Sequence, residues 1–199
     1  MKRGISGVIL AGGSSRRLPG ADKLSLDVGG AKLIERVRRT LTEFCPEIIV
    51  AGDGGVDASL PGARRVPDSR LGGEGPLAGL EAGLRASSND IVFAAAGDMP
   101  FLSPELAAHL CELVEKGNLS AAVPVYEGRA HPLCAAYHRE VAEGVSAALD
   151  GGTRSMAGFL ATLGRVEHVE EKLPLFGDPG RFLMNVNSPE DLERARSLA

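Results

Sequence analysis

Residues 8–23 read VILAGGSSRRLPGADK, and they contain the strongest fold signal of the chain. The apolar run at the start is short enough for one buried strand, and it ends in two glycines. Because Gly12 and Gly13 lack a Cβ, backbone N–H groups there can approach a polyphosphate closely. Arg17 and Lys23 supply countercharge in the same loop. The stretch therefore predicts a buried strand that leads into a phosphate-holding turn.

Strands and helices alternate outward from this segment. Apolar runs predict strands at residues 5–10, 47–51, 64–66, 91–96, 121–126, 132–137 and 165–169. Helical spacing and capping signals predict helices at residues 32–44, 76–84, 103–113, 139–149, 155–163 and after a capping box at 188–191. Short connections between alternating elements indicate an α/β protein with a mostly parallel sheet between two helix layers and a mixed edge. We expect one domain over residues 1–199.

Composition excludes several classes of protein. The 199 residues carry a net charge of −4, which argues against a nucleic-acid partner. With 44% hydrophobic residues there is still no apolar run of the length that a membrane span requires. Three cysteines without C-x-x-C spacing indicate neither a disulfide framework nor a cysteine zinc site. We expect a cytoplasmic protein that has no membrane partner and is a monomer.

Glycine-rich or acidic turns follow several predicted strands: Gly12–Lys23, Gly52–Gly55, Asp68 and Asp98. In open parallel sheets, ligands bind beyond the carboxyl ends of the strands, so these turns should surround one cleft. Taken alone, the first loop also fits a strand-to-loop turn with solvated arginines, and both aspartates fit ordinary turn positions. Their convergence on one edge favours an active site.

Asp98 is the strongest metal-ligand candidate. It follows an apolar strand directly and precedes Met99-Pro100. A carboxylate there suits Mg²⁺, which binds one or two carboxylates together with substrate phosphates. The glycines match neither the P-loop nor the dinucleotide pattern. No Ser-His-Asp arrangement is legible, so acyl transfer has no support.

Several motifs together resemble the molybdenum cofactor guanylyltransferase family. They are Leu10-Ala11-Gly12-Gly13 with Arg17 and Asp22-Lys23, Gly75-Pro76-Leu77-Ala78-Gly79, Gly97-Asp98-Met99-Pro100, His131-Pro132-Leu133, and Asn185-Val186-Asn187-Ser188-Pro189-Glu190-Asp191-Leu192. The first motif alone would indicate only the wider nucleotidyltransferase superfamily, whereas the last and the Gly-Pro-Leu-Ala-Gly motif narrow it. The resemblance covers residues 8–192.

The resemblance implies a Rossmann-like sandwich that joins GMP from Mg·GTP to the phosphate of molybdopterin and releases pyrophosphate. GTP and the molybdopterin cofactor would be the partners, with transient contacts to proteins of cofactor synthesis or to acceptor proteins. Attack by an anionic phosphate oxygen needs no strong general base, but it does need charge neutralisation.

The resemblance also implies a role for each matched residue. The nucleotide would be held by Leu10, Ala11, Gly12, Gly13 and Asp68, and its phosphates by Arg17 and Lys23. Asp98 would bind Mg²⁺, and the catalytic set would be Arg17, Lys23 and Asp98. The pterin would face Arg154, Asn185 and Asn187, with His131 near it.

Two departures from the family pattern affect the loops. Leu18-Pro19-Gly20 stands where methionine then glycine is common, and Gly52-Asp53 replaces an expected asparagine, for which Asp53 is a substitute candidate. Two alternatives also stay open. One is a cytidylyltransferase acting on the same pterin, and the other is a non-catalytic carrier of nucleotide or cofactor.

Overall fold

The computed structural model describes residues 4–12, 22–52, 60–68, 70 and 75–199. Its elements are β1 (Ile5–Leu10), η1 (Lys23–Ser25), β2 (Asp27–Val28), β3 (Ala31–Lys32), α1 (Leu33–Thr42), β4 (Glu47–Ala51), β5 (Ala63–Val66), α2 (Pro76–Ala86), β6 (Ile91–Ala96), α3 (Pro104–Gly117), β7 (Ala121–Tyr126), β8 (Arg129–Ala130), β9 (Cys134–His138), η2 (Arg139–Val141), α4 (Ala142–Asp150), α5 (Met156–Leu160), β10 (Val166–Val169), η3 (Leu173–Phe176), α6 (Pro179–Phe182) and α7 (Pro189–Leu198), where η marks a 3-10 helix.

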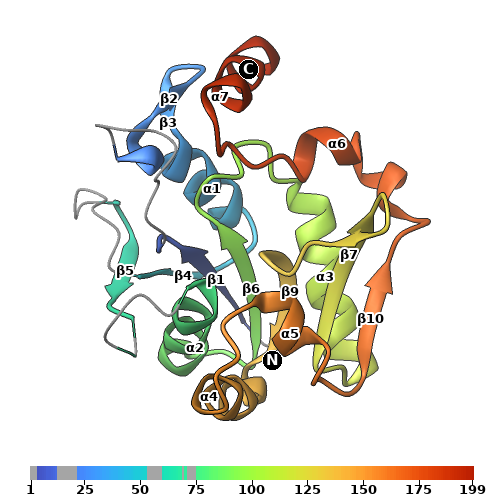
Figure 1. The fold of residues 1–199 in the computed structure, drawn as a ribbon. Helices are drawn as coiled ribbons and strands as arrows, with labels where there is room; N and C mark the ends of the chain where they lie inside the picture. The colour runs from blue at the N-terminus through green and yellow to red at the C-terminus, as the bar shows by residue number, and fades with distance from the viewer. Residues whose placement is uncertain (1–3, 13–21, 53–59, 69, 71–74) are drawn as a thin grey trace.

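One sheet runs through the molecule in the order β10-β7-β9-β6-β1-β4-β5, and β8 pairs with β7 (Figure 1). β1 is parallel to both β4 and β6, and β5 is parallel to β4. β9 is antiparallel to β6 and β7, which makes the far edge of the sheet mixed. The central strands therefore end at one edge, where Leu10, Ala51 and Ala96 lie in register.

Helices cover both faces of this sheet. Successive side chains of β1 point to opposite faces, and each face is apolar, so each packs against its own helices. Ile9 packs with residues of α1 and α3, whereas Val8 and Leu10 pack with residues of α2, α4 and α5. Val8 and Ile9 are fully buried, and burying such a side chain contributes about 1.5–3 kcal/mol. The expected three-layer α/β/α architecture is confirmed.

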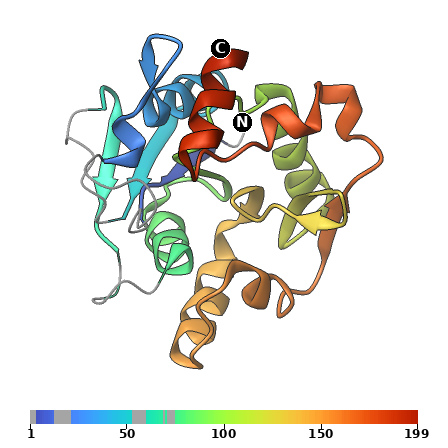
Figure 2. The same ribbon diagram turned by 45° about the horizontal axis from the view of Figure 1, so that its top comes forward.

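A third, smaller apolar cluster joins α7 to the β2–β3 hairpin. Val28 and Leu33 from the hairpin region pack with Leu192 and Ala195 of α7 and with Val186. Figures 1 and 2 show the red α7 beside the blue hairpin, although the two segments are far apart in the sequence. The C-terminal helix is thus attached to the segment that follows Lys23.

The second half of the chain differs in detail from the expected elements. β9 begins at Cys134 because Pro132 has no N–H to donate, and Cys134 N closes a turn on His131 O at 3.0 Å. The helix expected at 139–149 is divided into η2 and α4. None of the helices in the described ranges combines the length and hydrophobicity of a membrane-spanning segment.

Candidate active site at the carboxyl edge of the sheet

The ends of β1, β4 and β6 meet through backbone contacts. Ala11 N donates to Ala51 O at 2.8 Å, and Gly97 N donates to Leu10 O at 3.1 Å. A Cβ placed on Gly52 would lie 2.7 Å from Gly12 N, so the chain beyond β4 touches the chain beyond β1. The predicted nucleotide residues Leu10, Ala11 and Gly12 therefore lie at the junction of three strand ends.

Asp68 lies at the same junction. It follows β5 by two residues, and its carboxylate faces both the end of β1 and the first turns of α2. A Cβ built on Gly12 would lie 3.8 Å from Asp68 Oδ2, and one built on Gly79 would lie 3.4 Å from Asp68 Oδ1. The structure thus brings Asp68 to the predicted nucleotide-binding glycines.

Lys23 is held opposite Asp98 by the short helix η1. The Asp22 side chain caps this helix by accepting from Leu24 N at 3.2 Å. Leu24 is buried and packs against Gly97, since a Cβ on Gly97 would lie 3.2 Å from its methyl carbons. Lys23 Nζ consequently donates to Asp98 Oδ2 and forms an ion pair with only 17% and 13% of the two side chains exposed.

The two C-terminal asparagines complete this pair. Asn185 Nδ2 donates to Asp98 Oδ1 at 2.7 Å, and Lys23 Nζ donates to Asn187 Oδ1 at 2.8 Å. The residue between them, Val186, is fully buried, and its N–H donates to Asp98 O at 3.0 Å. Asn185 and Asn187, predicted from the resemblance to face the pterin, therefore lie directly against Asp98 and Lys23.

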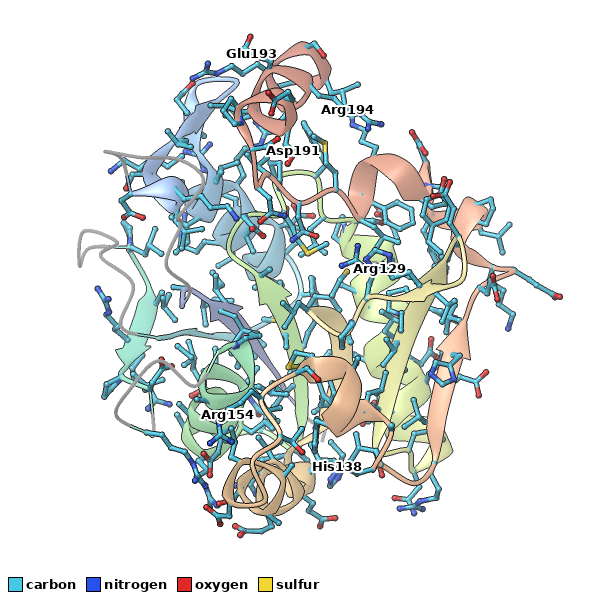
Figure 3. All side chains as sticks on the ribbon, viewed as in Figure 1. Arg129, His138, Arg154, Asp191, Glu193 and Arg194 are labelled. Carbon is cyan, nitrogen blue, oxygen red and sulfur yellow. The ribbon has the colours of Figure 1, made fainter. Side chains whose placement is uncertain are left out.

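The remaining site candidates are either outside the described residues or on other elements. Gly13, Arg17 and Asp53 lie outside the described residues. Arg154 lies in the α4–α5 connection, where its Nη1 donates to Leu149 O at 2.7 Å, and Figure 3 shows it well separated from Asp191 at the base of α7. The backbone of Arg154 lies near the start of α2, because a Cβ on Gly75 would lie 3.4 Å from Arg154 O.

His131 follows β8 and is half-buried at the edge of the sheet where β7 ends. Burial, and then the neighbouring Arg129 guanidinium, lowers the pKa of His131 below its usual value. Both effects favour the neutral imidazole. A neutral ring can donate one hydrogen bond and accept another, which suits a position beside a heterocyclic substrate.

The donors around Asp98 fit a hard cation that arrives with phosphates. Asp98 provides a carboxylate and Asn187 a carboxamide oxygen, which are ligand types that Mg²⁺ accepts. In the described ranges there is no group of three or more His, Cys, Asp or Glu side chains at metal-binding spacing. A Mg²⁺ ion here would lie near the Lys23 ammonium, and the negative charge of a triphosphate would offset both cations.

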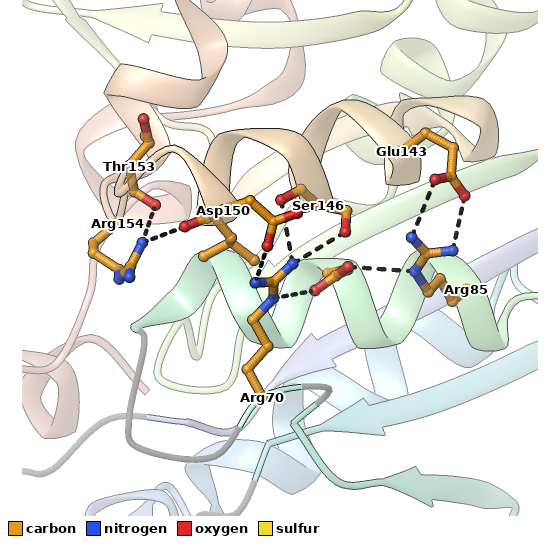
Figure 4. A network of polar contacts seen from close by, with 9 residues as sticks. Arg70, Arg85, Glu143, Ser146, Asp150, Thr153 and Arg154 are labelled. Atoms are coloured by element: carbon orange, nitrogen blue, oxygen red, sulfur yellow. Dashed lines mark hydrogen bonds and ion pairs between the residues drawn. The ribbon is translucent and has the colours of Figure 1, made fainter.

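Two supporting residues were not predicted from the sequence. Asp191 accepts hydrogen bonds from two backbone N–H groups that precede α7, and Arg70 pairs with Asp150 of α4 (Figure 4). The capping box at residues 188–191 does signal Asp191, but only as a helix start. For Arg70 no sequence signal exists, because its partners Glu81 and Asp150 lie on different helices.

Glycine-ended parallel strands beside a lysine–aspartate pair define this molecule as an α/β domain of the nucleotide-binding kind. Residues 7–168 match the family described as the MobA-like NTP transferase domain. The chain belongs to this family of nucleotidyltransferases. Asn185, Asn187 and Asp191 lie beyond the matched range.

Similar proteins of the same length support this membership. The chain is 37% identical over 195 residues to a probable molybdenum cofactor guanylyltransferase of Pelotomaculum thermopropionicum, covering 98% of this chain and 93% of that protein. It is 37% identical over 198 residues to a molybdenum cofactor guanylyltransferase of Cereibacter sphaeroides, covering 98% and 96%. The solved molybdopterin-guanine dinucleotide biosynthesis protein A of Archaeoglobus fulgidus has a TM-score of 0.81 and 30% identity, covering 97% of each chain.

Proposed function

We propose that this protein transfers GMP from GTP to the terminal phosphate of molybdopterin carrying its metal. A phosphate oxygen of the acceptor forms a bond to the α-phosphorus of GTP, the bond from that phosphorus to the bridging oxygen breaks, and pyrophosphate leaves. The observation that carries the proposal is the Lys23–Asp98 pair at the meeting point of the strand ends, closed by Asn185 and Asn187. The names of the full-length relatives support guanine as the base.

Each residue of the cluster has a role that its chemistry suits. Gly12 presents backbone groups to the nucleoside, Leu10 and Ala11 form the end of the strand beside it, and Asp68 accepts hydrogen bonds from the nucleoside. The Lys23 ammonium offsets the negative charge that builds up as two phosphate groups approach each other. Asp98 orients this ammonium through the hydrogen bond to its Nζ. Gly13 and Arg17 remain proposed as phosphate contacts.

Mg²⁺ is the proposed cofactor, with Asp98 as its protein ligand. When bound, it would neutralise phosphate charge at the reacting phosphorus. For the pterin we keep Arg154, Asn185 and Asn187 as contacts, with His131 beside them. We further propose that the protein works as a one-domain monomer in the cytoplasm, which its three buried free cysteines suit.

Replacing Lys23 or Asp98 tests the assignment. Lys23→Ala and Asp98→Ala should each lower the rate of GMP transfer by about 100-fold or more. The first removes the charge that stabilises the transition state, and the second removes the carboxylate that orients that charge. Lys32→Ala removes an exposed lysine of the neighbouring hairpin and should leave the rate unchanged. The measurement is pyrophosphate release with GTP, Mg²⁺ and molybdopterin. A fully active Asp98→Ala variant would refute the assigned role of this carboxylate.

A nucleotide panel separates the alternatives. Calorimetry with GTP, CTP and ATP, with and without Mg²⁺, should show the tightest binding for Mg·GTP. Preference for CTP would identify a cytidylyltransferase instead. Binding of GTP without pyrophosphate release in the presence of molybdopterin would identify a carrier.

A further inference from the structure

The side chain of Asp191, in the first turn of α7, contacts two backbone N–H groups that precede the helix. One oxygen of its carboxylate, Oδ2, accepts hydrogen bonds from Asn187 N at 2.8 Å and from Ser188 N at 2.9 Å. In return, Asp191 N donates to Ser188 Oγ at 3.2 Å, which completes a capping box. A simple cap needs only the bond to Ser188 N. The additional bond fixes the backbone of Asn187, which lies outside the helix.

Asn187 contacts the pair formed by Lys23 and Asp98. The Asn187 side chain accepts a hydrogen bond from Lys23 Nζ at 2.8 Å, and the same ammonium contacts Asp98. The preceding residues reach Asp98 from the other side, through the Asn185 side chain and Val186 N. A continuous series of hydrogen bonds therefore runs from the Asp191 carboxylate to the Lys23 ammonium.

The helix that carries Asp191 is also attached to the segment that carries Lys23. Leu192 packs against Val28 in the small apolar cluster, and Arg196 Nε donates to Asp27 O at 3.3 Å. Lys23 and Asn187 are thus both connected to α7, Lys23 through the neighbouring hairpin and Asn187 through Asp191. Figure 3 shows Asp191 at the base of α7, beside the chain that enters the site, and Glu193 on the outer side of the helix.

We infer that Asp191 is a positioning residue for the transfer reaction, which acts by holding Asn187 against Lys23 and so fixing Lys23 over Asp98. This inference rests on the proposed function. Asp191 itself touches neither substrate nor the reacting atoms. Its loss leaves every charged group of the site in place but loosens Asn187, one of the groups that hold the Lys23 ammonium, so the chemical step is affected more than nucleotide binding.

The test compares two acidic residues of the same helix. Asp191→Ala should lower kcat by about tenfold or more while the KM for GTP changes by less than about threefold, because misplaced groups fail mainly in the transition state. Glu193→Ala removes the same charge from the exposed face, where Glu193 pairs only with Arg196 among the described contacts, and should leave kcat within about twofold of the parent. Asp191→Glu keeps an acceptor that capping boxes commonly use and should restore most of the rate.

Two readouts separate positioning from stability and from the reaction itself. The side-chain amide NMR signals of Asn185 and Asn187 should move in Asp191→Ala and stay in place in Glu193→Ala, whatever the substrate. Failure of the parent protein to release pyrophosphate would overturn the proposed function and leave this spectroscopic test intact. Unchanged amide signals in a folded Asp191→Ala protein, or equal loss of kcat in both alanine variants, would overturn the inference.

Discussion

Gly52 is the residue with the least freedom to change at the strand ends. Its φ is +123°, a conformation that L side chains rarely adopt, and a Cβ there would lie 2.7 Å from Gly12 N and 3.1 Å from Ala11 C. These neighbours are backbone atoms of the proposed nucleotide site, so they cannot rotate away as a side chain would. The asparagine expected after this strand from the family resemblance is thus excluded at position 52 by the path of the chain.

Gly52→Ala should therefore impair nucleotide binding as well as stability. The strained φ costs about 1–3 kcal/mol, and displacement of Gly12 should raise the KM for GTP about tenfold. Gly62→Ala is the matched control, because Gly62 also has a positive φ of +74° but a Cβ there would meet nothing within 4 Å. Thermal unfolding should report a loss in both variants, and steady-state kinetics only in the first. A normal KM for Gly52→Ala would disprove the close approach.

The sequence indicated which residues lie at this site, but not which of them contact one another. Lys23, Asp68 and Asp98 could be named from the sequence because charged residues after apolar strands collect at one sheet edge. The bond from Lys23 to Asn187 spans 164 positions, and no local pattern indicates such a contact. Leu24, which holds Lys23 in place by packing on Gly97, is one apolar residue among many in the sequence.

At the scale of elements, α2 and α4 are joined by two arginine bridges that share one acid (Figure 4). Arg70 Nε donates to Glu81 Oε2 at 3.2 Å and its Nη1 to Asp150 Oδ1 at 2.6 Å. Arg85 Nε donates to Glu81 Oε1 at 3.3 Å, and its Nη1 donates to Glu143. The Glu81 side chain is only 4% exposed, so both bridges are anchored on a buried charge.

The two arginines differ in their position relative to Asp68, a residue of the proposed nucleotide site. Arg70 follows Asp68 by two residues, whereas Arg85 lies at the far end of α2. Arg70→Ala should raise the KM for GTP about tenfold, because the contacts with Glu81 and Asp150 that fix the chain two residues after Asp68 are lost. Arg85→Ala should lower the stability only slightly, because solvent screens the ion pairs of this 43% exposed side chain, and it should leave the KM unchanged. Equal KM values for the two variants would show that Arg70 only joins the helices.

Long elements followed from the sequence and short ones did not. β1, β4 and β6 have the expected bounds, because each ends in an apolar run that is followed within two residues by glycine. The hairpin of β2 and β3 was missed, since two residues a strand are too few for a detectable period. These short elements follow Lys23 directly, so the sequence periodicity predicted the structure least well beside this lysine.

At the scale of the whole molecule, the two ends of the parallel strands differ in function. At the amino ends, opposite the site, Glu47, the first residue of β4, connects neighbouring segments. Its carboxylate accepts hydrogen bonds from Ser6 Oγ at 2.5 Å, from Ser88 N at 2.9 Å and from Arg64 Nη2 at 3.1 Å. Burial alone would raise the pKa of Glu47, but these hydrogen bonds outweigh it and lower the pKa below the usual value.

Glu47→Gln should separate stability from activity. A carboxyl whose pKa is lower in the folded than in the unfolded state stabilises the fold above the unfolded pKa, and this contribution is lost as pH falls through the folded pKa. The variant should therefore be about 1–2 kcal/mol less stable at pH 7, and the difference should shrink below about pH 4.5. Urea unfolding at several pH values measures this. GMP transfer at pH 7 should be unchanged, and a lowered kcat would mean that the two ends of the strands are coupled.

The attachment of α7 to the hairpin has a consequence for biosynthesis. A ribosome makes the chain from its N-terminus, and every strand of the described sheet has been made once Val169 has emerged. Lys23 and Asp98 are then present, but Asn185, Asn187 and Asp191 are not. A nascent chain can thus build its sheet while its lysine still lacks the neighbours that orient it. Formation of the sheet can therefore precede assembly of the proposed site, which waits for the segment that carries Asn187 and for α7.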